Sequence, residues 1–163
     1  RIGSAGALQP GINIGDLVIP IAAVREDGTS KMYVSENYPA VSDFKLTSCI
    51  IDTAEKLQYT YVSGIIRSHD SFYCDRQEEI VGYWSNKGIL ASDMETATLY
   101  TVARLRGARA SCILNVVVPK GDSIKAGITQ YQTIEGPAKE GERREILLAL
   151  EALKALSTAE GRE

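Results

Sequence analysis

Residues 87–118 constrain the fold most, because they read as a strand, a sharp turn, a helix and a second strand. Ser92 and Glu95 stand at capping-box spacing, where a short apolar run gives way to a helical pattern. Gly107 follows a last turn that carries two arginines, which is typical of a helix C-terminus. The pattern predicts a helix over residues 93–106, with two carboxylates and a thioether at its N-terminal end.

Apolar runs alternate with amphipathic helical patterns along the rest of the chain. Residues 111–118 are almost all apolar, as in a strand covered on both faces, and residues 17–24 form a similar strand with an irregularity at Pro20. Strands that alternate with helices predict an α/β fold with a mixed central β-sheet flanked by helices. The other expected elements are strands over 31–34 and 59–66, a helix capped by Asp43, a helix over 77–86, a lid or binding loop over 119–136, and a closing helix whose apolar face is Ile146, Leu150, Leu153 and Leu156.

The composition excludes several classes of protein and fits a single domain over residues 1–163. With a net charge of −3 and no basic stripe, the chain is not expected to bind nucleic acid. Three scattered cysteines and one histidine offer no metal-ligand spacing, so we expect no metal and a reducing cytoplasmic setting. No apolar run is long enough to span a membrane, and no membrane partner is expected.

The first six residues, RIGSAG, combine a cation with a turn of small residues. Gly3 and Gly6 let backbone N–H groups converge, Ser4 adds a hydroxyl, and Arg1 adds a two-pronged guanidinium. Together they could hold a phosphate dianion, although G-x-x-G turns are common and a plain turn remains the alternative. Because the chain starts with Arg1 rather than Met, we expect it to be the later part of a longer chain.

Four polar clusters follow apolar strands, and ligands bind at strand ends in open α/β sheets, so the clusters are expected to line one cleft. The clusters are Arg1 with Ser4, residues 68–73, residues 93–95, and Pro119 with Lys120. Structural alternatives stay open for their members. Glu95 could serve only the capping box, and Met94 and Phe72 could simply pack. His69 and Asp70 are adjacent on a strand and point to opposite faces, which favours a structural histidine over a catalytic pair.

Four segments carry the motifs of a known enzyme family: RIGSAGALQP, VREDGTSKMYVSENYPAVSDF, SHDSFYCD and GILASDMETATLY. They resemble the nucleoside phosphorylase family, in the branch of hexameric bacterial uridine and purine nucleoside phosphorylases. The joint occurrence of R-x-G-[ST]-x-G and [ED]-M-E-[ST]-A is highly specific, and the resemblance covers nearly the whole chain. It implies a homo-oligomer, either a dimer or a trimer of dimers. It also implies that the family's N-terminal portion is absent here, with its phosphate loop and the residues that complete a neighbouring subunit's site.

The resemblance implies phosphorolysis, in which phosphate replaces the base at C1′ of a ribonucleoside through a transition state with oxocarbenium character. It assigns Arg1, Gly3 and Ser4 to the phosphate, and a guanidinium suits that role because it binds two phosphate oxygens at once. Arg1 and Glu95 would be the catalytic residues, acting through electrostatics and positioning. Nucleoside and inorganic phosphate are then the expected partners, and no metal, covalent nucleophile or further cofactor is required.

The resemblance also assigns the sugar contacts. Glu95 would accept hydrogen bonds from the 2′- and 3′-hydroxyls and fix the ribose against the incoming phosphate. Met94 would pack on the ribose. Phe72 would support the base or the sugar through apolar contact.

The base contacts decide which nucleoside is cleaved. Purine-cleaving relatives place Ser-Asp where this chain has Val117 and Val118, and that acid protonates the departing purine. The valine pair matches the uridine phosphorylase branch, in which a Gln and an Arg read the pyrimidine. This chain has Arg76 and Gln77 in that region, in reversed order, and Lys120 is expected near the same pocket. We therefore expect conversion of uridine and phosphate to uracil and ribose 1-phosphate; the alternatives are a purine nucleoside phosphorylase, a nucleosidase, or a non-catalytic nucleoside-binding protein.

Overall fold

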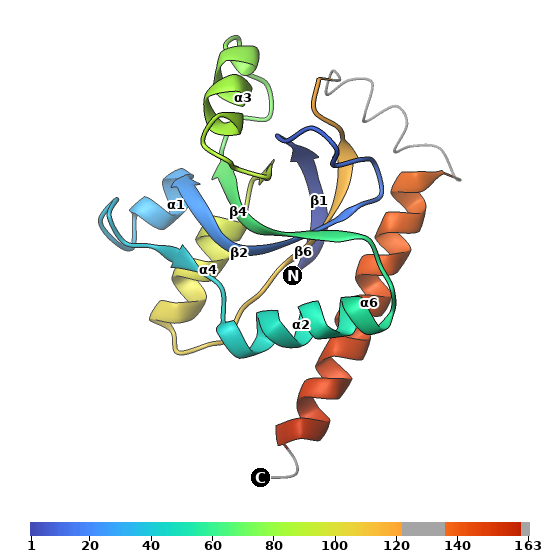
Figure 1. The fold of residues 1–163 in the computed structure, drawn as a ribbon. Helices are drawn as coiled ribbons and strands as arrows, with labels where there is room; N and C mark the ends of the chain where they lie inside the picture. Colours follow the sequence, from blue (N-terminus) through green and yellow to red (C-terminus); the bar gives the residue numbers. More distant parts are fainter. Residues whose placement is uncertain (122–135, 161–163) are drawn as a thin grey trace.

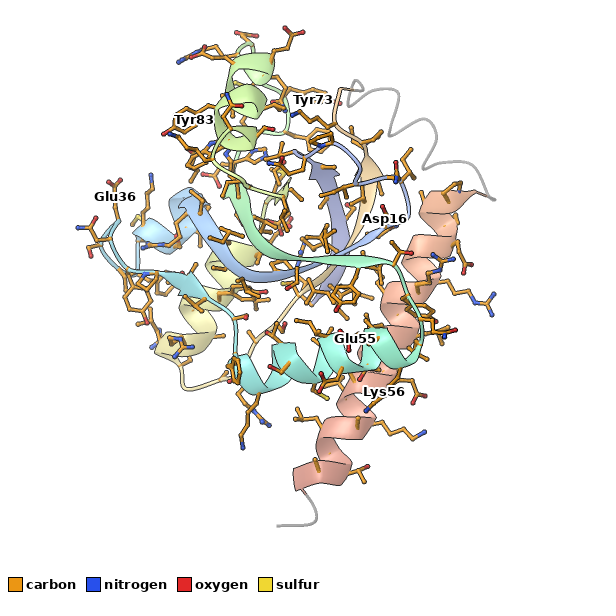
Figure 2. All side chains as sticks on the ribbon, in the orientation of Figure 1. Asp16, Glu36, Glu55, Lys56, Tyr73 and Tyr83 are labelled. Atoms are coloured by element: carbon orange, nitrogen blue, oxygen red, sulfur yellow. The ribbon has the colours of Figure 1, made fainter. Side chains whose placement is uncertain are left out.

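The computed structural model describes residues 1–121 and 136–160 (Figure 1), and Figure 2 shows side chains on the same ribbon. The strands are β1 (Ile2–Ala7), β2 (Leu17–Glu26), β3 (Ala40–Val41), β4 (Tyr61–His69), β5 (Ala91–Asp93) and β6 (Ile113–Val118). The helices are α1 (Gly28–Lys31), α2 (Phe44–Lys56), α3 (Gln77–Ser85), α4 (Thr96–Leu105) and α6 (Pro137–Glu160). Most of the lid expected over 119–136 lies outside the described residues. In the part of the chain described, no helix is long and apolar enough to cross a membrane.

The strands form one mixed sheet that closes on itself. Their order is β3-β2-β4-β5-β1-β6, and β6 also pairs back with β2. The β2–β4, β4–β5 and β1–β6 pairs are parallel, whereas β1–β5, β2–β3 and β2–β6 are antiparallel. The expected mixed α/β architecture is therefore confirmed, and β5, β1 and β6 are neighbours in the sheet.

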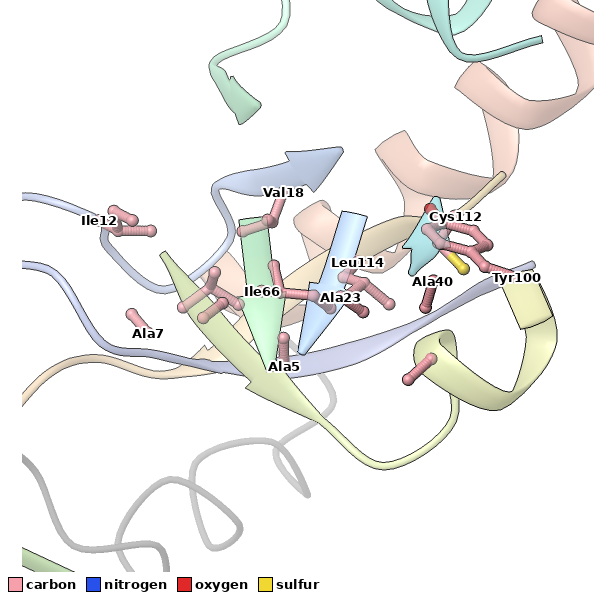
Figure 3. Close-up of a cluster of buried hydrophobic side chains, with 13 residues drawn as sticks. Ala5, Ala7, Ile12, Val18, Ala23, Ala40, Ile66, Tyr100, Cys112 and Leu114 are labelled. Atoms are coloured by element: carbon pink, nitrogen blue, oxygen red, sulfur yellow. The ribbon is translucent and has the colours of Figure 1, made fainter. Parts of the chain in front are cut away.

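Two apolar cores lie on the two faces of this sheet. The inner core contains Val18, Ile66 and Leu114 together with Tyr100 from α4 (Figure 3). The outer core is formed by Leu17, Ile19 and Ile113 of the sheet and by Ile50, Ala54, Leu148 and Ala152 of α2 and α6. Because successive residues of β2 and β6 enter opposite cores, both strands need apolar side chains throughout. This explains the continuous apolar runs in the sequence.

Local sequence signals position two further features as expected. Asp43 caps α2, because its Oδ1 accepts the Leu46 N–H at 2.8 Å. The ladder between β2 and β4 shifts register between Pro20 and Ala22, which confirms the irregularity at the proline. The free carbonyl of Pro20 accepts a 2.7 Å hydrogen bond from the Tyr100 hydroxyl, so the irregularity is tied to α4.

The strand expected over 31–34 is wrong. Asp27 instead caps the short helix α1, since its Oδ1 accepts the Ser30 N–H at 2.6 Å. The following loop is held by Arg25, whose Nη1 donates to the carbonyls of Ser35 and Tyr38 at 2.6 and 2.7 Å. The side-chain cap and the guanidinium satisfy backbone groups that a strand would have paired.

The closing helix is confirmed, but its predicted apolar face is wrong. Ile146, Leu150 and Leu153 are 41%, 60% and 55% exposed. The buried face is Ala138, Gly141, Glu145, Leu148 and Ala152. Small residues face the sheet because the helix lies very close to it: a Cβ atom on Gly141 would lie 2.1 Å from the side-chain oxygen of Asn115. The tight contact places Glu145, one turn further along, directly against β1 and β6.

Candidate functional site

The junction between β5 and α4 positions the acidic residues of the candidate site. The predicted helix start at residue 93 and the predicted capping box are both wrong, because Asp93 still belongs to β5 and α4 begins at Thr96. Glu95 is the N-cap residue by its backbone position, but Asp93 supplies the capping side chain: its Oδ2 accepts the Thr96 N–H at 3.1 Å and the Thr96 hydroxyl at 2.6 Å. Glu95 makes no side-chain cap hydrogen bond. Its carboxylate is therefore available for another role.

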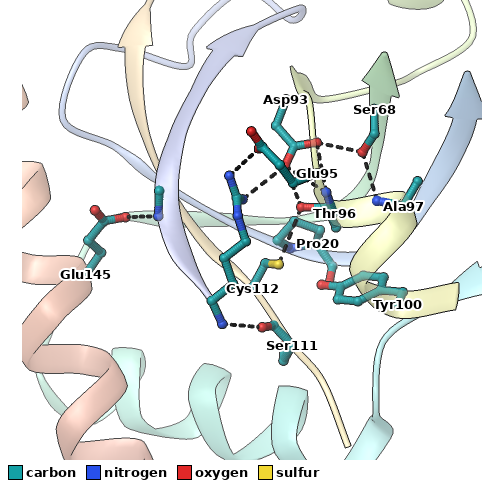
Figure 4. A network of polar contacts seen from close by, with 12 residues as sticks. Pro20, Ser68, Asp93, Glu95, Thr96, Ala97, Tyr100, Ser111, Cys112 and Glu145 are labelled. Atoms are coloured by element: carbon teal, nitrogen blue, oxygen red, sulfur yellow. Dashed lines mark hydrogen bonds and ion pairs between the residues drawn. The ribbon is translucent and has the colours of Figure 1, made fainter. Parts of the chain in front are cut away.

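Arg1 lies directly beside this junction, whose residues Asp93, Glu95 and Thr96 are labelled in Figure 4. Its Nη1 forms a 3.0 Å ion pair with Asp93 Oδ2, and its Nη2 contacts the Glu95 carboxylate. The Asp93 side chain is fully buried, whereas that of Glu95 is 57% exposed. One edge of the guanidinium is thus anchored inside the protein, and the other edge meets an exposed carboxylate. Two residues that are 94 positions apart in the sequence are thus in direct contact.

Asp93 also connects a third strand to this group. The Ser68 hydroxyl of β4 donates to Asp93 Oδ1 at 2.6 Å and accepts the Ala97 N–H at 2.9 Å. Asp93 therefore receives hydrogen bonds or an ion pair from β4, from α4 and from Arg1. Sequence reasoning noted Asp93 and Ser68 only as members of polar clusters. The sequence signal for this cap was an Asp at the end of an apolar run, three residues before Thr96.

Gly3 explains how the guanidinium reaches this position. A Cβ atom on Gly3 would lie 2.9 Å from Arg1 Nη2 and 3.1 Å from Arg1 Cζ. The guanidinium thus rests against the backbone of β1, where only a hydrogen side chain leaves room for it. Ser4, the next candidate for the phosphate, has an exposed side chain in the same strand.

Replacing Gly3 by alanine is expected to weaken phosphate binding about ten- to a hundredfold, because the added methyl displaces the guanidinium. The free energy of unfolding should change by less than about 1 kcal/mol, since the displaced atoms end a flexible side chain. Phosphate titration and thermal unfolding of the complete gene product measure both quantities. Gly82→Ala is the matched control, because an added Cβ there meets nothing within 4 Å. Unchanged phosphate affinity in Gly3→Ala would refute the assignment of Arg1 to phosphate.

The candidate residues for the base and sugar lie in the loop after β4, between β5 and α4, and at the start of α3. Phe72 is exposed, and its ring meets Tyr73 edge to face at 5.1 Å. Met94 is half-buried between Asp93 and Glu95. Arg76 starts α3, and its guanidinium binds the carboxylate of Glu79 with two hydrogen bonds of 2.5 and 2.8 Å. Its neighbour Gln77 is half-buried in the first turn of the same helix. The charge of Arg76 is thus already paired in this structure.

Val117 and Val118 end β6 and are half-buried. Val118 pairs with Gly6, so the valine pair lies on the strand next to the Arg1 strand. Lys120 contacts α3: its Nζ donates to Ser85 Oγ, at the end of that helix, at 2.6 Å. The structure thus joins the Arg1, Ser68 and Asp93–Glu95 clusters by direct contacts and ties Lys120 to α3.

His69 and Asp70 are not paired with each other. Asp70 Oδ2 accepts the Gly28 N–H at 2.7 Å and so holds the start of α1. His69 is half-buried at the end of β4, and its burial and the charge of Arg67 lower its pKa. This geometry agrees with the structural alternative for the pair.

Two surface hollows lie away from the charged pair. One, of about 210 Å³, is lined by Val41, Tyr100 and Arg104, and the other, of about 240 Å³, by Lys139 and Leu147. Neither is lined by the charged pair. The described residues also contain no group of three or more His, Cys, Asp or Glu side chains that could hold a metal ion.

Comparison with known proteins places this geometry in a family. A model of the phosphorylase superfamily matches residues 1–142. The chain belongs to the phosphorylase superfamily. The match includes β1 with Arg1, the β5–α4 junction with Glu95, and the end of β6.

Uridine phosphorylases are prominent among its relatives. The uridine phosphorylase of Thermococcus kodakarensis is 40% identical over 169 residues, which cover 96% of this chain and 57% of the relative. The guanosine phosphorylase of Halorubrum lacusprofundi is 35% identical over 96% of this chain and 64% of its own length. A crystal structure of uridine phosphorylase from Vibrio fischeri ES114 superposes with a TM-score of 0.84, at 42% identity, over 95% of this chain and 62% of that one. The expected nucleoside phosphorylase fold is confirmed, and the chain spans 57% and 64% of the length of these two curated relatives.

Proposed function

We propose that the complete protein catalyses the phosphorolysis of a pyrimidine nucleoside, with uridine and inorganic phosphate as substrates and uracil and ribose 1-phosphate as products. The observation that carries this proposal is the contact between the Arg1 guanidinium and the Glu95 carboxylate. Phosphorolysis needs a cation for the attacking oxyanion and an acceptor for the sugar diol within one substrate's length of each other. The pair supplies both at one point.

The Arg1 guanidinium could exchange its Glu95 contact for phosphate while it keeps its Asp93 contact. Asp93 is buried and fixes Nη1, whereas Glu95 is exposed and contacts Nη2. A phosphate dianion can take the Nη2 edge while the Asp93 contact keeps the arginine in place. Glu95 is then released to accept hydrogen bonds from the 2′- and 3′-hydroxyls of the ribose. In the absence of substrate the two charges neutralise each other.

Electrostatics would carry the catalysis. As the bond from C1′ to the base breaks, positive charge develops on the sugar. The phosphate dianion on Arg1 and the carboxylate of Glu95 both place negative charge beside it. Holding the phosphate and the ribose in register also converts a bimolecular step into an effectively unimolecular one. Met94, half-buried next to Glu95, would pack against the ribose.

The end of β6 favours a pyrimidine. Val117 and Val118 carry no group that can transfer a proton, so a purine leaving group would receive none from this pair. The relatives named above include one guanosine phosphorylase, which makes a purine nucleoside the second candidate. Phe72 offers an exposed aromatic face for either base, and Arg76, Gln77 and Lys120 are the proposed polar contacts.

We further propose that inorganic phosphate is the only co-substrate, that no other cofactor takes part, and that the protein is a cytoplasmic homo-oligomer. Its free cysteines, Cys49, Cys74 and Cys112, fit a reducing compartment. Large exposed apolar side chains, including Met32, Phe44 and Leu150, support burial of surface in an assembly.

A substrate comparison tests the proposed function. The complete gene product is assayed with phosphate and uridine, thymidine or inosine, and the products are separated by chromatography. We expect uracil and ribose 1-phosphate in equal amounts from uridine, and far slower release of hypoxanthine from inosine. Preferred cleavage of inosine would contradict the role of Val117 and Val118. Binding of uridine without any turnover would favour a non-catalytic protein.

A further inference from the structure

Glu145 is a buried carboxylate that the proposed reaction does not use. It lies on α6, is only 4% exposed, and its Oε2 accepts the Gly3 N–H at 3.2 Å. Figure 4 shows it reaching β1 from the side of α6, away from Asp93 and Glu95. A carboxylate is costly to bury, because its charge loses hydration that few hydrogen bonds can replace. This cost falls on a side chain that directly contacts Gly3, a candidate residue for phosphate.

Gly3 lies between this carboxylate and the Arg1 guanidinium. The Arg1 guanidinium rests against Gly3, with Nη2 2.9 Å from where a Cβ atom would be, and Glu145 receives the N–H of the same glycine. A phosphate bound at Arg1, Gly3 and Ser4 would thus lie within a few residues' width of a second negative charge. The charge of Arg1 already acts on Glu145, so a dianion bound at Arg1 would act on the same carboxylate.

The surroundings hold Glu145 close to its titration point. Burial raises its pKa to about 7, against the opposing effect of the Gly3 N–H. Glu142 on the same helix raises the pKa further, whereas the backbone N–H of Asn115 on β6 and the charge of Arg1 on β1 lower it. Arg1 is thus one of the groups that keep this carboxylate ionised. Glu142 and Arg1 are the charged residues that act on it among those described.

We propose that Glu145 is a positioning residue that couples phosphate binding to the uptake of a proton from solvent onto its own carboxylate. This inference rests on the proposed function. A dianion at Arg1 cancels the positive field that favours the ionised carboxylate and adds a like charge beside it. The neutral carboxyl group still has a carbonyl oxygen that accepts the Gly3 N–H, so β1 keeps its position. Linkage is reciprocal: if phosphate favours the proton, the proton favours phosphate by the same factor.

The charge of Glu145 determines how phosphate affinity changes with pH. Below its pKa, Glu145 is neutral and does not oppose the dianion; above it, the carboxylate repels the dianion. The dissociation constant for the phosphate dianion should therefore rise about fivefold as the pH goes from 6 to 8. Glu145→Gln keeps an oxygen acceptor for Gly3 without a titrating charge, and its constant should stay at the low-pH value of the wild type. The ionisation of phosphate itself is the same for both proteins and cancels in the ratio.

Calorimetry with inorganic phosphate on the complete gene product tests the inference. Titration at neutral pH in buffers of different ionisation enthalpy gives the number of protons exchanged. We expect the wild type to take up more protons than Glu145→Gln, and Glu151→Gln, an exposed glutamate on the same helix, to match the wild type. Equal proton exchange and equal pH dependence in wild type and Glu145→Gln would overturn the role of Glu145 and leave phosphorolysis intact. If neither the wild type nor either variant binds phosphate at any pH, the proposed function is contradicted, and this inference with it.

A second measurement does not depend on the variant folding. In an infrared difference spectrum of the wild type at neutral pH, phosphate addition should increase the C=O band of a protonated carboxyl group. Absence of that band in a protein that binds phosphate would refute proton uptake at Glu145.

Discussion

Replacement of Glu95 by alanine should lower kcat/KM for uridine phosphorolysis by about a hundred- to a thousandfold while the fold survives. The carboxylate is 57% exposed and does not cap α4, so its removal takes no hydrogen bond from the helix. What is lost is the acceptor for the ribose diol and the negative charge beside the developing cation. Arg1 loses a competing partner at the same time, so the KM for phosphate should stay the same or fall.

Steady-state kinetics with each substrate varied, together with circular dichroism, separates these effects. Glu36→Ala is the matched control, because Glu36 is an exposed glutamate in a surface ion pair with Lys31 at 3.4 Å. It should retain wild-type kinetics. An inactive Glu95→Ala protein that is also unfolded would favour a structural role for Glu95, and full activity would remove it from the mechanism.

Replacement of Asp93 by alanine should have the largest effect on stability, about 3–5 kcal/mol in the free energy of unfolding. Its buried carboxylate pairs with Arg1 at 3.0 Å and accepts hydrogen bonds from Ser68 and Thr96, both at 2.6 Å. Removal leaves two buried hydroxyls without this acceptor, takes the cap from α4, and releases the anchored edge of the guanidinium. Any protein that still folds should bind phosphate more weakly.

Asp93→Asn is the informative companion, measured by urea unfolding alongside Asp93→Ala. The amide oxygen can replace Oδ2 and still accept from Thr96, whereas the NH2 group replaces the oxygen that accepts from Ser68. One of the two acceptors is kept, so the loss of stability should be smaller, about 1–3 kcal/mol. The charge that anchors Arg1 is gone in both variants, so both should have a raised KM for phosphate. A wild-type KM for phosphate in Asp93→Asn would show that Arg1 does not depend on this ion pair.

The elements predicted correctly are those whose signal is contained in a few neighbouring residues. The apolar runs of β2 and β6, the Asp43 cap of α2 and the position of α3 all follow from local pattern. The predicted face of α6 failed because burial there is decided by distance to the sheet. Gly141 lies against Asn115, where a larger residue would not fit, and Leu150 and Leu153 of the predicted apolar face point outward. Closure of the sheet through β2 and β6 has no local signal either.

Some residues of the candidate site were likewise predictable from local motifs, and others were not. The motifs around Arg1 and Glu95 predicted two charged groups of one cleft, and the structure places them in contact. The capping box was wrong because Ser92 and Asp93 remain in β5, which moves the cap to Asp93. Glu145 could not have been found from sequence, since one glutamate among many on a long polar helix carries no mark of burial.

In the proposed reaction Arg1 holds a phosphate that attacks a ribose held by Glu95. To test this, the complete gene product is assayed on uridine with and without inorganic phosphate, and uracil and ribose 1-phosphate are quantified. We predict uracil release only in the presence of phosphate, with one ribose 1-phosphate formed for each uracil. Equal release of uracil in phosphate-free buffer, with free ribose as the second product, would contradict this account.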